Sequence, residues 1–290
     1  MKVKVKKDSY SRDVLKKFSQ HKLAMIGLAI ILLEVFLVVV LPAAMNLDPY
    51  TSDIMNFSGK PGPGHLLGTD DTGRDVFARL VYGGRVSLIV GLLSAIISLL
   101  IGVPLGLLAG YYKGIWETII MRAADIFMSF PSMILILVLV SVFKPSVWTI
   151  VFVIGVLGWT DFAKLIYGNV LSIREKEYVE SAKAIGTKDF RLLMKYVIPN
   201  AFAPILINFT FRTAQAIIQE SALSFLGMGV QAPQASWGNI LFAAQSITVL
   251  SSRPWLWVPA GILLVLTVSS INFIGDGMRD ALDSRTKIKK

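Results

Sequence analysis

The sequence predicts an all-α integral membrane protein with six transmembrane helices and a cytoplasmic helix-turn-helix. Hydrophobic residues make up 54% of the 290 residues and charged residues only 17%, which is too apolar for a soluble domain of this length. The apolar residues form blocks near the length of about 20 residues that a helix needs to cross a bilayer. These blocks are continuous rather than alternating, so helices are favoured over a barrel.

Six blocks are apolar enough to be predicted spans. They cover residues 23–47, 86–112, 124–143, 145–160, 200–226 and 254–275. The fourth block is short, so we expect it to extend past Asp161 toward Ile166, with Asp161 and Lys164 near the membrane interface. The first block exceeds the apolar core of about 7–15 residues in a cleavable signal peptide, which favours an uncleaved anchor.

Lysine and arginine predict the orientation. Residues 1–22 hold eight of them, residues 165–198 six and residues 279–290 five, whereas residues 229–252 hold none. Cytoplasmic loops of membrane proteins carry the excess of these residues, so both termini and the 165–198 loop are predicted to be cytoplasmic. Six spans satisfy that parity, and they place the 47–85 connection outside or along the outer interface.

The net charge of +10 is explained by this topology and by attraction to anionic lipid. Nucleic-acid binding is disfavoured because the basic residues are split among the ends and loops. The chain has no cysteine and only two histidines, His21 and His65, so disulfides, thiolate metal sites and a histidine cluster are excluded.

The segment 174–199 is predicted to be an interrupted amphipathic helix. Its apolar residues recur at three- and four-residue spacing and are expected to form one stripe; they are Tyr178, Val179, Ala182, Ile185, Phe190, Leu193, Met194 and Val197. Gly186 is typical of a left-handed helix cap, and a new helix is expected to start at Thr187 or Asp189. An alternative is an interfacial helix that rests on lipid headgroups.

The residues from Glu177-Tyr178-Val179-Glu180-Ser181-Ala182 to Tyr196-Val197-Ile198-Pro199-Asn200 resemble the EAA loop of permease subunits of binding-protein-dependent ABC importers. The chain departs from that pattern at Ser181, Tyr196 and Ile198, and these changes largely preserve size or apolarity. Further motifs are similar to the second permease subunit of the dipeptide, oligopeptide and nickel branch: Leu67-Gly68-Thr69-Asp70, Tyr82-Gly83-Gly84-Arg85, Met121-Arg122, Leu223-Ser224-Phe225-Leu226-Gly227, Ser236-Trp237-Gly238 and Gly275-Asp276-Gly277-Met278.

The resemblance implies a heteromeric importer made of this subunit, a homologous permease subunit, two ATPase subunits or domains and an external solute-binding protein. The implied organisation is a basic cytoplasmic N-terminus (1–22), a first helix with its external connection (23–85), the importer transmembrane domain (86–277) and a cytoplasmic tail (278–290). The implied ATPase-coupling residues are Glu180, Ser181, Ala182, Gly186 and Pro199. The chain lacks the glycine-rich phosphate loop with its lysine, so no ATP hydrolysis and no catalytic residue are expected here, and ATP is bound by the partner subunits.

Three charges inside predicted spans are candidates for the translocation pathway. Glu34, Arg212 and Glu220 lie where charge is costly, so each is expected to face a water-filled path or another subunit. Arg212 and Glu220 are eight residues apart, about 12 Å along a helix, and cannot pair directly. Structural pairing remains an alternative for both, and for Glu34 a structural or lipid-edge position is favoured.

Other functions remain open at this point. Short peptides are the favoured substrate, and a nickel or metal-chelate importer is the alternative within the same branch. A stand-alone secondary transporter or channel would need its own ion or proton relay, which three scattered charges do not obviously supply. A membrane-anchored scaffold without transport activity is a further alternative.

Overall fold

The computed structural model describes residues 10–282, and the regular elements of this part are helices. The N-terminal part contains α1 (Tyr10–Gln20), α2 (Lys22–Ala44) and α3 (Val76–Tyr112). The middle part contains α4 (Gly114–Ser129), α5 (Ser132–Phe143), α6 (Val147–Leu157), α7 (Trp159–Arg174), α8 (Glu177–Ala184) and α9 (Asp189–Leu192). A π-helix (Leu193–Val197), α10 (Ile198–Phe225), α11 (Trp237–Leu241), α12 (Ile247–Ser252) and α13 (Val258–Leu282) follow, with short 3-10 turns at Phe242–Gln245 and Pro254–Leu256.

Five helical segments of the described part are long and apolar enough to cross a membrane, and a bent pair brings the number to six. The single helix predicted for residues 124–143 is wrong, because α4 and α5 meet at an angle of 89°. Pro131 lies at the break and lacks the backbone N–H that a continuous helix needs. A proline also disfavours helical geometry in the residue before it, and Phe130 is extended (φ −96°, ψ 143°).

The other spans differ from the prediction mainly at their ends. Helix α3 begins at Val76, ten residues before the predicted start, and Asp75 caps it by accepting a hydrogen bond of 2.7 Å from the N–H of Ala78. Helices α6 and α7 form one segment, Val147–Arg174, which extends past Asp161 as expected and continues eight residues beyond Ile166. Helix α9, the π-helix and α10 also run on as one segment, Asp189–Phe225.

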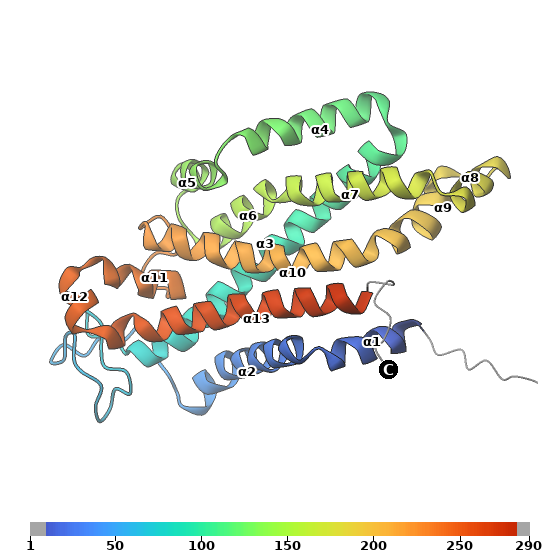
Figure 1. The fold of residues 1–290 in the computed structure, drawn as a ribbon. Coiled ribbons are helices and arrows are strands. Elements are labelled where there is room, and N and C mark those ends of the chain that lie inside the picture. Colours follow the sequence, from blue (N-terminus) through green and yellow to red (C-terminus); the bar gives the residue numbers. More distant parts are fainter. Residues whose placement is uncertain (1–9, 283–290) are drawn as a thin grey trace, which may run out of the picture.

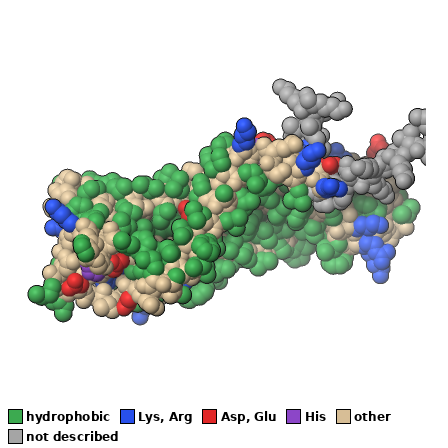
Figure 2. Space-filling model, turned by 90° about the horizontal axis from the view of Figure 1, so that it is seen from below, with side chains coloured by type: hydrophobic (Ala, Val, Ile, Leu, Met, Phe, Trp, Pro, Cys, Tyr) green, Lys and Arg blue, Asp and Glu red, His purple; other side chains and the backbone are tan. Residues whose placement is uncertain are grey.

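The spans lie side by side and their loops gather at two opposite ends (Figure 1). Helices α1, α8 and α9 and the end of α13 mark one end, called here the α8 end. The 45–75 connection, α11 and α12 mark the other, called here the α12 end. Figure 2 shows hydrophobic side chains over the middle of one face and most of the charged ones toward the two ends, as expected for a molecule that crosses a bilayer.

Helix α3 is the centre of the bundle, with α6, α7 and α10 packed against it. Gly102, Gly106 and Gly110 let α7 approach closely: a Cβ added at Gly106 would lie 2.6 Å from the carbonyl oxygen of Ala163. Small residues spaced by four on a helix allow such backbone contact inside membranes. The α3–α7 contact therefore depends on these three glycines having no side chain.

The 45–75 connection is held by charges at the α12 end. The Arg79 guanidinium is buried and donates to the carbonyl oxygens of Pro49 and Pro233, and it pairs with Asp70 at 3.4 Å. Burial alone would raise the pKa of Asp70, but hydrogen bonds from Arg74 and Thr72 hold that pKa below its ordinary value. The carboxylate thus stays charged and keeps the connection against the start of α3.

Candidate coupling corner and transport pathway

The coupling corner, residues 177–192, is a helix-turn-helix at the α8 end. Gly186 has a φ of +81°, as the sequence predicted, and glycine takes that conformation without a steric penalty. The N–H of Gly186 donates to the carbonyl of Lys183 at 2.9 Å, and the N–H of Thr187 donates to that of Ala182 at 3.1 Å. These two bonds form a Schellman cap, and α9 then starts at Asp189, one of the two predicted positions.

The single apolar stripe predicted for residues 174–199 is wrong. Val179, Ala182 and Val197 are buried, and so is Leu192, which the helical spacing had missed. The other members of the predicted stripe are partly or largely exposed, including Ile185 (83%) and Phe190 (75%). The cap at Gly186 resets the helical phase, so one side of each short helix faces the bundle and the tip of the corner carries exposed apolar side chains.

The predicted coupling residues lie in different settings within this corner. Glu180, Ser181 and Gly186 are exposed, whereas Ala182 is buried. Pro199 is exposed at the start of α10, where a missing N–H costs little. The corner therefore presents a charged and polar surface while Ala182 packs it onto the bundle.

Two hydrogen bonds tie the corner to α3. The hydroxyl of Tyr111 donates to the Asp189 carboxylate at 2.6 Å, and the Arg174 guanidinium donates to the carbonyl of Tyr111 at 3.0 Å. The end of α3 is thus bound both to the start of α9 and to the end of α7.

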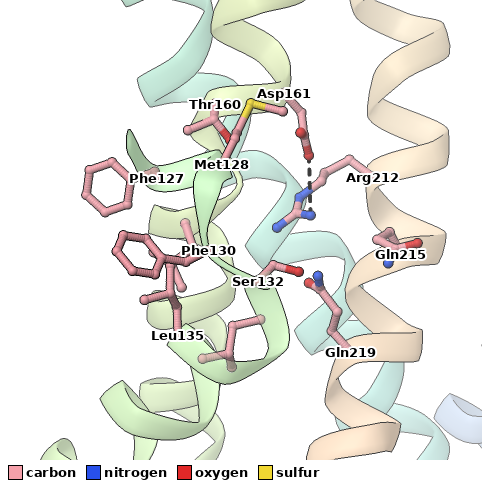
Figure 3. Close-up of a pocket in the computed structure, with 12 residues that line it drawn as sticks. Phe127, Met128, Phe130, Ser132, Leu135, Thr160, Asp161, Arg212, Gln215 and Gln219 are labelled. Carbon is pink, nitrogen blue, oxygen red and sulfur yellow. Dashed lines mark ion pairs between the residues drawn. The ribbon is translucent and has the colours of Figure 1, made fainter. Parts of the chain in front are cut away.

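Arg212 lines a cavity of about 310 Å³ between α10, the α4–α5 break and the start of α7 (Figure 3). It is 6% exposed, donates to the carbonyl of Ile154 at 2.8 Å and to the Ser98 hydroxyl at 3.5 Å, and pairs with Asp161 at 3.6 Å. Asp161 was expected near an end of its span, but it lies in the middle because the helical segment starts at Val147 and continues to Arg174. The pair places opposite charges beside each other at mid-span.

Glu220 is fully buried and does not border that cavity. Its carboxylate accepts hydrogen bonds from the hydroxyls of Ser87 at 3.1 Å and Ser224 at 2.7 Å. Those hydroxyls in turn accept from the N–H groups of Trp237 and Val230. Within the chain, the surroundings of Glu220 agree with the structural alternative given in the sequence analysis. Its carboxylate anchors the loop before α11 to α3 and α10.

Glu34 is also nearly buried and lies between helices of the same chain. The hydroxyl of Thr267 on α13 donates to one carboxylate oxygen at 2.7 Å, and the other oxygen has no hydrogen-bond partner among the described residues. It borders an apolar cavity of about 400 Å³ formed by α2, α3 and α13. This position agrees with the structural alternative for Glu34 and lies apart from Arg212.

The described part of the chain is thus a bundle of membrane-length helices with an exposed, capped corner between two of its spans. Residues 102–288 match the family model described as "Binding-protein-dependent transport system inner membrane component", and residues 9–61 match "N-terminal TM domain of oligopeptide transport permease C". The chain belongs to the family of binding-protein-dependent transport system inner membrane components. It is a multi-pass membrane protein and a transport permease.

Relatives match over nearly the whole chain. The Oligopeptide transport system permease protein OppC of Bacillus subtilis is 38% identical, with 98% of this chain and 93% of the relative covered. The Dipeptide transport system permease protein DppC of the same organism is 38% identical, covering 96% and 87%. A putative peptide permease protein of Brucella suis is 40% identical, covering 94% and 90%.

The fold is also found in solved structures. The methionine ABC transporter MetNI, in an inward-facing conformation, superposes with a TM-score of 0.59 at 20% identity and covers 71% of this chain and 98% of its own. An amino acid ABC transporter gives a TM-score of 0.54 at 16% identity, covering 70% and 94%. At these identities the likeness concerns the fold alone.

Proposed function

We propose that this chain forms half of the translocation pathway for short peptides in an ABC importer and couples it to a separate ATPase. The observation that carries the coupling role is the tip of the corner, where Ile185 and Phe190 are 83% and 75% exposed, in the same helix-turn-helix as the exposed Glu180. Exposed apolar side chains with a polar rim are typical of a protein contact. The same corner continues through the π-helix into α10, which carries Arg212.

Peptides are the proposed substrate because the three relatives named above are oligopeptide, dipeptide or putative peptide permeases. The proposed partners are a homologous permease subunit, two ATPase subunits or domains that bind the ATP, and an external solute-binding protein. A change in the ATPase pair would move the docked corner and switch the bundle between inward- and outward-facing states.

The proposed site residues divide into two groups. Glu180, Ser181, Ala182, Gly186 and Pro199 belong to the coupling corner, and Ala182 acts there by packing the corner onto the bundle. Arg212 is the proposed pathway residue because it lines the cavity beside the α4–α5 break. Glu34 and Glu220 support the pathway from a distance, through α13 and through the loop before α11.

The proposed location is the cell membrane with both termini in the cytoplasm. Reporter fusions after Lys22, Lys195 and Lys290 are expected to report cytoplasm, and fusions after Gly62 and Ala235 the exterior, because lysine and arginine are concentrated at the α8 end. The measurement is the ratio of a reporter active only in the cytoplasm to one active only outside. A cytoplasmic reading at Ala235 would contradict this orientation.

The importer function is tested by co-expressing the chain with its gene neighbours and purifying it through a tag. The expected result is a complex that contains an ATPase with a phosphate-binding loop and that, in vesicles, imports a radiolabelled alanine tripeptide only with ATP and the binding protein. Nickel chelate is the competing substrate in the same assay. Import of the chelate instead, or uptake by the chain alone in vesicles, would contradict the proposal.

A further inference from the structure

Four polar side chains form a line on one face of α10. Asn208, Arg212, Gln215 and Gln219 are spaced by four, three and four residues, and this spacing keeps them within a narrow arc of the helix. They extend over about 16 Å at 1.5 Å per residue. This set is called here the amide line, since three of its four members carry a primary amide.

Two atoms of the amide line are buried without a hydrogen-bond partner among the described residues: the Gln219 carbonyl oxygen Oε1 and the Asn208 amide nitrogen Nδ2. Gln219 is only 7% exposed, so its amide is withdrawn from the outer surface of the chain. Buried polar groups are nearly always hydrogen-bonded, and those that are not call for an explanation. The missing partners for one acceptor and one donor are therefore expected from outside the chain.

For Gln219 the cavity beside Arg212 is where such a partner fits, whereas Asn208 lies one turn before Arg212 and is not part of the cavity lining. Gln215 and Gln219 line it together with Arg212, and Figure 3 shows Gln219 extending across it toward Ser132. The cavity volume of about 310 Å³ is at the lower end of small-molecule sites. The residues around the α4–α5 break form its opposite wall, among them Phe130 and Ser132.

The chemistry of the line determines which ligand it suits. A primary amide offers both a donor and an acceptor and no charge, which matches the N–H and C=O of a peptide group. The charge of Arg212 is balanced by Asp161 at 3.6 Å, so the cavity wall does not select strongly for acidic or basic ligands. The part of the line that borders the cavity, from Arg212 to Gln219, extends over about 10 Å, which corresponds to roughly three residues of extended chain.

We infer that the amide line binds the main chain of the transported peptide, through hydrogen bonds that do not depend on its side chains. This inference rests on the proposed peptide-transport function and adds the part of the substrate that α10 recognises. Gln219 is a specificity-determining residue in this scheme: it distinguishes a peptide bond from an isosteric bond without an N–H. The side chains of the peptide are not recognised at this site.

The test uses the complete transporter in vesicles with its ATPase and binding protein. The substrates are an alanine tripeptide and its analogue with an ester in place of the central amide, each loaded to saturation on the binding protein. For the unchanged chain we expect faster import of the peptide than of the ester. Gln219→Met should lower peptide import about three- to tenfold, the range for one lost hydrogen bond, and bring the peptide-to-ester ratio close to one.

Thr213→Val is the matched control, because Thr213 lies on the same helix outside the line and its hydroxyl bonds within α10, to the carbonyl of Phe209. Its peptide-to-ester ratio is expected to equal that of the unchanged chain. An unaltered ratio in Gln219→Met would overturn the inference. Failure of Gln219→Met to assemble with its partner subunits would also overturn the inference, because it would show that the Gln219 amide bonds to a neighbouring subunit and not to the peptide. No import of the tripeptide by the unchanged transporter would contradict the proposed function itself.

Discussion

Replacing Gly186 with valine is expected to lower ATP-dependent import at least tenfold while the subunit still accumulates in the membrane. A β-branched residue at a φ of +81° costs about 1–3 kcal/mol, enough to open the Schellman cap and swing α9 away from α8. A Cβ at this position would meet nothing within 4 Å, so the effect comes from backbone strain and not from collision. Import and co-purification of the ATPase are the measurements.

Gly114→Val is the control for this experiment. Gly114 also has a positive φ (+60°), a Cβ there would likewise meet nothing within 4 Å, and it too lies at the α8 end, between α3 and α4. It therefore carries a similar backbone cost outside the coupling corner. Import by Gly114→Val should stay within about twofold of the unchanged chain, because the strain falls on the turn between α3 and α4 and leaves the cap at Gly186 intact. Equal losses in both variants would contradict the special role of the corner.

Replacing Gly106 with leucine is expected to prevent the subunit from folding into a stable bundle. Even a methyl group would lie 2.6 Å from the Ala163 carbonyl oxygen and 2.8 Å from Ile166 Cβ, and a leucine would force α3 and α7 apart. Overpacking of this kind costs about 1–3 kcal/mol or more. The yield of monodisperse protein in detergent and its unfolding temperature measure the effect, and both should fall sharply.

Gly168→Leu tests whether any glycine in this helix pair would give the same result. Gly168 is on α7, is exposed, and a Cβ there would have nothing within 4 Å. Leucine has a better helix propensity than glycine by roughly 0.8 kcal/mol, so yield and unfolding temperature should be unchanged or higher. A loss at Gly168 as large as at Gly106 would show that the effect is not caused by close α3–α7 contact.

The order of the spans could be predicted from the sequence because hydropathy and charge are local signals. The left-handed cap at Gly186 could also be predicted, because a glycine followed by polar residues that start a new helix is a pattern of neighbouring residues. The early start of α3 was missed because Arg79 and Arg85 lower the hydropathy there. Arg79 donates hydrogen bonds to the carbonyl oxygens of Pro49 and Pro233. The hydropathy of neighbouring residues contains no information about partners so far away in the sequence.

The candidate pathway shows the same limit. Arg212 was found as a charge inside a span, but its pairing with Asp161 depends on how α7 and α10 pack, which spacing along the chain does not reveal. The serine hydroxyls around Glu220 come from α3, α10 and the loop before α11. The break at Pro131 was visible as a proline in the sequence, yet the apolar residues on both sides masked it as one continuous span.

The continuity of Asp189–Phe225 makes the coupling corner and the end of α10 parts of one long helical segment. At 1.5 Å per residue its 37 residues make a rod about 55 Å long, with the coupling corner at one tip and the Glu220 anchor near the other. Pivoting about its middle by only about 5° would displace each tip by roughly 2 Å in opposite directions. The π-helix at Leu193–Val197 joins the coupling corner to α10 within this segment, so a tilt of the corner would be carried along one helical segment toward Glu220.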